Sequence, residues 1–203
     1  MSHSVPLVAA RRGKEIDDIA FKLVEAFQPD AVRMVTSFDV ERFFEFELKK
    51  QTGVEPVYQP LGYGLEGLIN IEAMECIICA NAANYGDSDM KRRRVRATQA
   101  HEIGHCHLHV AELRQTRVAR ELRHDSQHGD SDLYKQEEIK VYQNPEWQAW
   151  RFAGALLMPE CCVRAAVYHK WTKKMMSRAF DVNVAFLEVR LHDLRIPDRV
   201  RMG

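Results

Sequence analysis

The sequence lacks a hydrophobic run long enough to cross a membrane, and it also lacks the core of a signal peptide. Only a short apolar run precedes Arg11 and Arg12 near the N-terminus, which is too little for a secretory signal. No later stretch approaches the roughly 18 apolar residues of a transmembrane helix. We therefore expect a cytoplasmic protein that does not associate with membranes.

The sequence also lacks net charge, since Lys and Arg together number 29 and Asp and Glu together number 29. No overall field therefore draws the protein toward nucleic acid or anionic lipid. A partner of that kind would need a local patch, and the basic run at 91–96 is the candidate. That run is either a solvated charged face or a contact for nucleic acid or an acidic substrate segment.

Disulfide-forming cysteines are lacking as well. The five cysteines are an odd number in no disulfide-like spacing, which is typical of a reducing compartment. Cys76 and Cys79 have the C-x-x-C spacing, but no second pair follows, and residues i and i+3 of a strand point to opposite faces. We predict that these two are core thiols, and that Cys161 and Cys162 are structural.

The hydrophobic pattern of the first half predicts helices followed by a small sheet. Apolar residues recur at helical spacing from 13 to 27, and Asp39 can cap a second helix that stops at Gly53. Residues 54–59 read as an edge strand because Pro56 cannot donate to a sheet ladder, and residues 66–80 read as one or two strands.

The second half is predicted to be helical. Asn144 and Pro145 are typical of a helix start, and Asp181 or Asn183 breaks the C-terminal pattern. The predicted fold class is α+β, with a small sheet between 55 and 85 packed against a mostly helical body. We expect a flexible N-terminus at 1–13, a single domain at 14–197 whose C-terminal helical part is 160–197, and a tail at 198–203.

The segment "RATQAHEIGHCHLH" at 96–109 contains the pattern H-E-x-x-H. On a helix, His101 and His105 lie on one face one turn apart, so both imidazoles can bind one zinc ion. Glu102 can then take a proton from zinc-bound water. The alternative is a helix with surface histidines, but Gly104 lowers helix propensity by about 1 kcal/mol, which favours a close backbone approach instead.

The remaining histidines of this segment have lesser predicted roles. His109 continues the same face but lies roughly 12 Å from His101 along an unbroken helix, so we predict a supporting role. A metzincin would need Gly at 108 and His at 111, where this chain has Leu108 and Ala111. That class is excluded, and His107 is predicted to lie on the surface.

A catalytic zinc site needs a third protein ligand. Glu146 is favoured because it opens an otherwise apolar helix, where a carboxylate is costly unless it is paired or binds metal. The alternative is that Glu146 only favours the positive end of the helix dipole. The other downstream candidates are His124, His128, Glu137 and Glu138.

The H-E-x-x-H segment, followed by "EWQAWRFAGALLMP" at 146–159, resembles the ImmA/IrrE family of zinc peptidases over roughly residues 65–195. The resemblance implies a zincin-like fold with H-E-x-x-H on a central helix. It also implies one Zn²⁺ per chain, held by His101, His105 and Glu146, with Glu102 as general base. Trp150 stands where the family usually has Asn, so the hydrogen bonds around the ligand Glu146 are expected to differ from the family's. The insertion at 110–143 is expected to shape or cover the cleft.

The resemblance further implies a zinc metallopeptidase that cleaves a protein, often a helix-turn-helix repressor, in a stress response that regulates transcription. One alternative is a non-catalytic or structural-metal partner of a regulator, of the toxin–antitoxin or mobile-element type. Another is a DNA-binding protein built on the C-terminal helices. Residues 184–194 hold one Arg and two acidic residues, which is poor chemistry for phosphates, so we expect this helix to pack on the core and expect no direct nucleic-acid binding.

Overall fold

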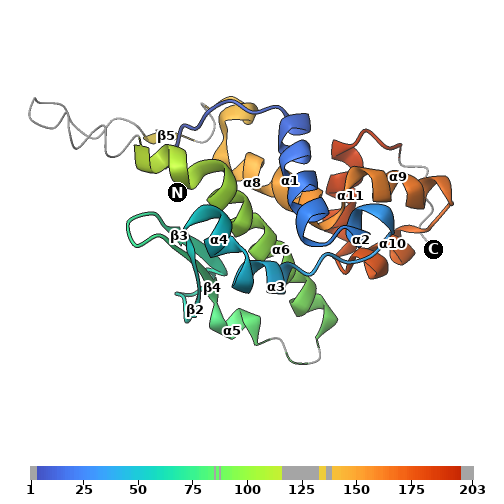
Figure 1. Ribbon diagram of the computed structural model, residues 1–203, viewed down its shortest axis with the longest axis horizontal. Helices are drawn as coiled ribbons and strands as arrows, with labels where there is room; N and C mark the ends of the chain where they lie inside the picture. The colour runs from blue at the N-terminus through green and yellow to red at the C-terminus, as the bar shows by residue number, and fades with distance from the viewer. Residues whose placement is uncertain (1–3, 85, 87, 116–132, 136–138, 198–203) are drawn as a thin grey trace, which may run out of the picture.

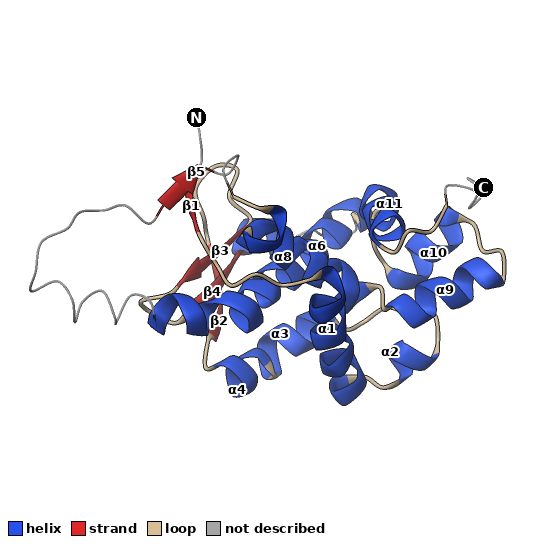
Figure 2. Ribbon diagram, turned by 90° about the horizontal axis from the view of Figure 1, so that it is seen from above, coloured by secondary structure: helices blue, strands red, loops and turns tan. Residues whose placement is uncertain are grey.

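The computed structural model describes residues 4–84, 86, 88–115, 133–135 and 139–197. The chain is mostly helical with a small three-stranded sheet, so the predicted α+β class is confirmed. Figures 1 and 2 show the sheet toward one end of the molecule and the C-terminal helices toward the other, with the long helix α6 (Asp89–His105) between them. None of the described helices is long and apolar enough to span a membrane.

The sheet contains β2 (Glu55–Gln59), β3 (Gly67–Asn70) and β4 (Glu75–Cys79) in the order β2-β4-β3. β2 runs parallel to β4 and β3 runs antiparallel to it. β2 is an edge strand, as Pro56 predicts, and β3 forms the other edge. Cys76 and Cys79 are buried free thiols in the central strand, which confirms the prediction for this pair.

Helix α6 crosses α8 (Pro145–Leu157), and the crossing depends on Gly104. A Cβ added at Gly104 would lie 3.1 Å from the carbonyl oxygen of Ala149 and 3.1 Å from Cδ1 of Phe152. Such distances are tighter than ordinary van der Waals contact. The close backbone approach that a small residue at this position predicts is therefore present.

The predicted start of α8 is also confirmed. The side chain of Asn144 accepts hydrogen bonds from the backbone nitrogens of Glu146 at 2.9 Å and Trp147 at 3.2 Å, so Asn144 is the N-cap. Pro145 occupies the first helical position, where its missing N–H costs nothing. Glu146 is thereby held in the first turn of a helix that packs on α6.

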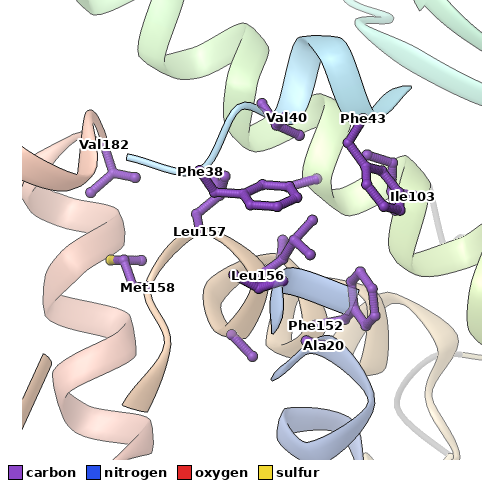
Figure 3. Close-up of a cluster of buried hydrophobic side chains, with 14 of the residues drawn as sticks. Ala20, Phe38, Val40, Phe43, Ile103, Phe152, Leu156, Leu157, Met158 and Val182 are labelled. Atoms are coloured by element: carbon purple, nitrogen blue, oxygen red, sulfur yellow. The ribbon is translucent and has the colours of Figure 1, made fainter. Parts of the chain in front are cut away.

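The main core lies where α1 (Gly13–Phe27), α3 (Val40–Phe46), α6 and α8 meet. Figure 3 shows its buried side chains. They include Ala20, Phe38, Val40, Phe43, Ile103, Phe152, Leu156, Leu157, Met158 and Val182. Asp39 caps α3 as predicted, with its carboxylate accepting from the backbone nitrogen of Arg42. The helix is divided, and its second part α4 (Leu48–Thr52) ends at Gly53 in the left-handed conformation.

The C-terminal part consists of α9 (Glu160–Tyr168), α10 (Lys173–Phe180) and α11 (Val184–Asp193). Asp181 has a φ of 52° and makes the predicted break between α10 and α11. Arg190 of α11 is 1% exposed and donates to the carbonyl of Met158 and the carboxylate of Asp17. α11 therefore packs on the core as predicted, and its arginine is not available to bind phosphates.

Shorter elements complete the described chain. They are β1 (Ser4–Pro6), which pairs antiparallel with β5 (Leu133–Lys135), and α2 (Asp30–Arg33), α5 (Ala80–Ala83), the π-helical turn η1 (Cys106–Val110) and the 3₁₀ turn η3 (Val141–Gln143). Val8 is buried just after β1. The domain bounds stay a prediction. The ligand candidates His124, His128, Glu137 and Glu138, the middle of the 110–143 insertion and the tail at 198–203 lie outside the described residues.

Candidate metal centre

Three side chains from α6 and α8 bring their donor atoms together. The Nε2 atoms of His101 and His105 lie 3.0 Å apart, and the Glu146 carboxylate lies 3.3 Å from the first and 3.4 Å from the second. Ligands about 2.0–2.1 Å from a tetrahedral zinc ion are separated by roughly 3.3 Å. Across the described ranges, these residues form the only group of three or more metal-ligating side chains this close together, and their separations fit zinc.

The protonation states of this group also suit a metal, because ligands bind in their deprotonated forms. Hydrogen bonds with His101 and His105 hold the pKa of Glu146 well below its ordinary value. Burial lowers the pKa of His101, which outweighs the opposite effect of Glu146. A carboxylate and two imidazoles are a donor set typical of catalytic zinc sites.

Glu102 lies beside this group and is 7% exposed. Burial raises the pKa of its carboxyl to about 7. The strand β3 comes so close that a Cβ added at Gly67 would lie 2.5 Å from Oε1 of Glu102 and 2.7 Å from its Cγ. Only glycine leaves room for the carboxylate there. Gly67 was not among the predicted site residues, although a glycine at a strand is a known signal of close approach.

Trp150 covers one side of the metal centre. Its ring centroid lies 4.3 Å from that of His101 and 5.8 Å from that of Phe186. The side chain remains 44% exposed. At the position where the family pattern has Asn, this chain therefore has an aromatic ring that contacts the ligand residue His101.

His109 lies on the far side of His105 from His101. Its Nδ1 is 3.0 Å from Nδ1 of His105, and its Nε2 is 3.1 Å from Oε1 of Gln148. His109 does not belong to the three-ligand group. Gln148, which is 0% exposed, was not among the predicted site residues. The signal for it was an amide in an otherwise apolar stretch of α8.

The prediction that His107 lies on the surface is wrong. Its ring stacks on Phe152 with centroids 5.9 Å apart and an interplanar angle of 18°, and it lies 6.2 Å from the ring of Phe43. Burial lowers the pKa of His107 to about 4. The reason is that α6 and η1 are packed on more than one side, so the face away from the metal centre meets α3 and α8 rather than water.

The metal centre opens into a cavity of about 770 Å³, a volume typical of ligand sites. Its lining includes Gly67, Leu68 and Ile69 of β3, together with Trp150 and Phe186. His101, Glu102, His105 and Glu146 also line it. The cavity can thus accept an extended, partly apolar chain next to the three donor atoms.

The basic run at the start of α6 is held by carboxylates of the same chain. Arg92, Arg93 and Arg96 all contact the Asp181 carboxylate, at 2.7, 3.0 and 3.4 Å. Arg94 pairs with Glu66 at 2.7 Å. Three arginines of the run thereby fasten α6 to the turn between α10 and α11, and Arg94 joins it to the segment before β3.

The chain belongs to the peptidase M78 family, whose model is described as the IrrE N-terminal-like domain and matches residues 87–192. The match includes all four residues discussed above as ligands and general base. Peptidases of this family are zinc-dependent in general.

Among solved structures, the chain is similar to a Mycobacterium tuberculosis transcriptional regulator, with a TM-score of 0.55 and 16% sequence identity. The similarity covers 93% of this chain and 49% of that one, so this chain spans about half of its length. At this identity the likeness shows the fold alone. No curated protein matches the chain.

Proposed function

We propose that this chain is a zinc-dependent peptidase that hydrolyses a peptide bond at the centre formed by His101, His105 and Glu146. The observation that carries the proposal is the convergence of these three donor atoms within 4.8 Å of one another, in a cavity that Glu102 also lines. Family membership supports the peptidase class, and the donor set supports zinc.

In this proposal the two imidazoles and the Glu146 carboxylate hold one Zn²⁺. The ion supplies Lewis acidity, which polarises a scissile carbonyl and lowers the pKa of water. Glu102 accepts a proton from the attacking water and returns it to the leaving amine. Gly67 keeps β3 close enough to restrict where the Glu102 carboxylate can lie.

The cavity walls favour an extended polypeptide as substrate. β3 is the edge of its sheet, so its outer backbone groups can pair with a substrate strand. Leu68 is 41% exposed and Trp150 is 44% exposed, and both line the cavity. We propose that these two and Phe186 receive an apolar side chain near the scissile bond.

The finer proposal for the substrate is a helix-turn-helix repressor, cleaved in the cytoplasm as part of a stress response that regulates transcription. Its support is the resemblance to the ImmA/IrrE family. The solved structure described above is of a transcriptional regulator, and that role belongs to that protein.

The decisive experiment is the Glu102→Gln variant, assayed with a helix-turn-helix protein encoded beside this chain. We expect zinc content to stay at about one ion per chain and cleavage to be lost, because the amide cannot accept the proton. Glu25→Gln, which alters an exposed carboxylate on α1, should cleave like the wild type. Continued cleavage by Glu102→Gln would show that the general-base assignment is wrong.

Binding measurements on the wild-type protein separate the alternatives. A wild-type protein that binds zinc and the regulator but never cleaves it would be a non-catalytic partner. Duplex binding that weakens steeply with salt would indicate a DNA-binding protein, whereas the pairing of the basic run with Asp181 and Glu66 argues for a negligible signal.

A further inference from the structure

We propose that Gln148, acting through His109, determines which ring nitrogen of His105 carries a proton, so that Nε2 of His105 is left free to bind metal. Gln148 and His109 are thus positioning residues for one zinc ligand. This inference rests on the proposed zinc site, but its test below does not require peptidase activity.

The orientation of the Gln148 amide is set by backbone partners. Its Nε2 donates to the carbonyl of Ala9 at 2.9 Å and to that of Tyr142 at 2.8 Å. Both protons of the amide nitrogen are therefore used. Oε1 must then face the other way, where it accepts from Nη1 of Arg11 at 3.1 Å and lies 3.1 Å from Nε2 of His109.

An amide oxygen can only accept, so Nε2 of His109 must carry a proton. His109 is 1% exposed, and the guanidinium of Arg11 contacts the same Gln148 oxygen. In its neutral form the ring has only this one proton. The neutral ring then presents a lone pair at Nδ1.

The lone pair of His109 determines the state of His105. The two Nδ1 atoms lie 3.0 Å apart, so one of them must donate, and only His105 is left to do so. With zinc bound, a proton on Nδ1 leaves the lone pair of His105 on Nε2, the ring nitrogen that lies 3.4 Å from Oε1 of Glu146. A partner that fixes the tautomer of a ligand histidine is a known way to strengthen metal binding.

The other ligand, His101, is held differently. Within the described part of the chain, its buried Nδ1 has no hydrogen-bond partner, and its ring is packed against Trp150. The relay also reaches the N-terminal segment, since Ala9 donates its backbone N–H to Glu112 and its carbonyl accepts from Gln148. Residues 9–11 are thereby connected to His105 through the relay.

The first test is long-range ¹H–¹⁵N NMR of the full chain, metal-free and after zinc addition, with the nine histidines assigned from single His→Phe variants. We expect a proton on Nδ1 of His105 and on Nε2 of His109 in both samples. A proton on Nδ1 of His109, or an unprotonated Nδ1 on His105, overturns the relay. Failure to bind zinc would overturn the proposed function instead, because the metal-free spectrum reports the relay alone.

The second test measures zinc affinity by competition with a chromophoric chelator. His109→Phe should weaken zinc binding by about 10- to 100-fold, and Gln148→Met should weaken it less, because His109 remains as a partner with a free choice of tautomer. The matched control is His107→Phe, which alters a histidine of the same turn that stacks on Phe152 outside the relay and should leave the affinity unchanged.

Thermal unfolding of each variant separates positioning from folding. A merely structural Gln148 would lower the melting temperature while leaving the His105 ring-nitrogen shifts as in the wild type, and that result overturns the proposal. Unchanged zinc affinity in folded His109→Phe also overturns it. If neither variant folds, the tautomers measured in the wild-type protein decide the matter.

Discussion

The two halves of α6 use their basic side chains in opposite ways. In the first half, Arg92, Arg93 and Arg96 converge on one carboxylate, Asp181, and are occupied by it. In the second half, two histidines also converge on one carboxylate, but their donor atoms face a cavity of about 770 Å³. A guanidinium always donates, whereas a neutral imidazole offers a lone pair, so the first cluster fastens the fold and the second can bind metal.

The largest expected effect comes from removing the carboxylate of the histidine cluster. Glu146→Ala should reduce zinc content from about one ion per chain to nearly none, because two ligands rarely hold a catalytic zinc. His101→Ala should do the same, and elemental analysis of the purified proteins measures both. His128→Ala, which removes a rival ligand candidate, should keep its zinc; loss of zinc there with retention in Glu146→Ala would move the third ligand elsewhere.

The next effect separates chemistry from metal binding within the same cluster. Gly67→Ala places a Cβ where the Glu102 side chain lies, so the carboxylate must shift. A misplacement of this size should lower kcat by about 100-fold while zinc content stays unchanged. Gly62→Ala is the matched control, since a Cβ there meets nothing within 4 Å. Equal kcat values for the two variants would contradict the role assigned to Gly67.

A smaller effect tests the arginine cluster. Asp181→Asn keeps a residue that tolerates the positive φ of 52° but leaves three guanidinium groups without their shared charge. We expect unfolding free energy to fall by about 2 kcal/mol, below the range for fully buried pairs because Asp181 is partly exposed. Urea unfolding measures it, and zinc affinity should not change. A variant that loses zinc affinity as well would mean that the two clusters are coupled.

The difference in stability between the wild type and Asp181→Asn should also depend on pH. Burial alone would raise the pKa of Asp181, but hydrogen bonds from Arg92 and Arg93 outweigh it and the pKa is lowered. The stabilisation is then fully present above the unfolded pKa, about 3.9, and is lost as the pH falls through the lower folded value. The stability difference between wild type and Asp181→Asn should therefore be constant near neutral pH and shrink only in acid.

The smallest effect concerns the wall of the cavity. Trp150→Ala removes an aromatic surface that we expect to contact an apolar substrate side chain, so KM should rise by about tenfold with a smaller change in kcat. Steady-state kinetics on a peptide spanning the cut site measures both values. Tyr168→Ala, which alters an aromatic side chain that is 83% exposed on α9, should leave KM unchanged. A rise in KM for both variants would rule out a local contact.

Local sequence signals were sufficient for most elements. Asn144 with Pro145 predicted the start of α8, Gly53 predicted the end of α4, and Pro56 predicted an edge strand, because each acts through its own backbone geometry. The prediction for His107 failed for a different reason. Helical spacing tells which residues share a face, but not how many faces of a central helix are covered.

The sequence by itself determined the donor types and their spacing: two histidines one turn apart, a glutamate beside them, and a second glutamate at a capped helix start. Only the tertiary structure decided what surrounds each donor. The contact of Gly67 with Glu102, the three arginines on Asp181, and the Gln148–His109 relay all join residues far apart in the chain. Such hydrogen bonds and close contacts depend on the path of the backbone between the partners, and no local pattern encodes that path.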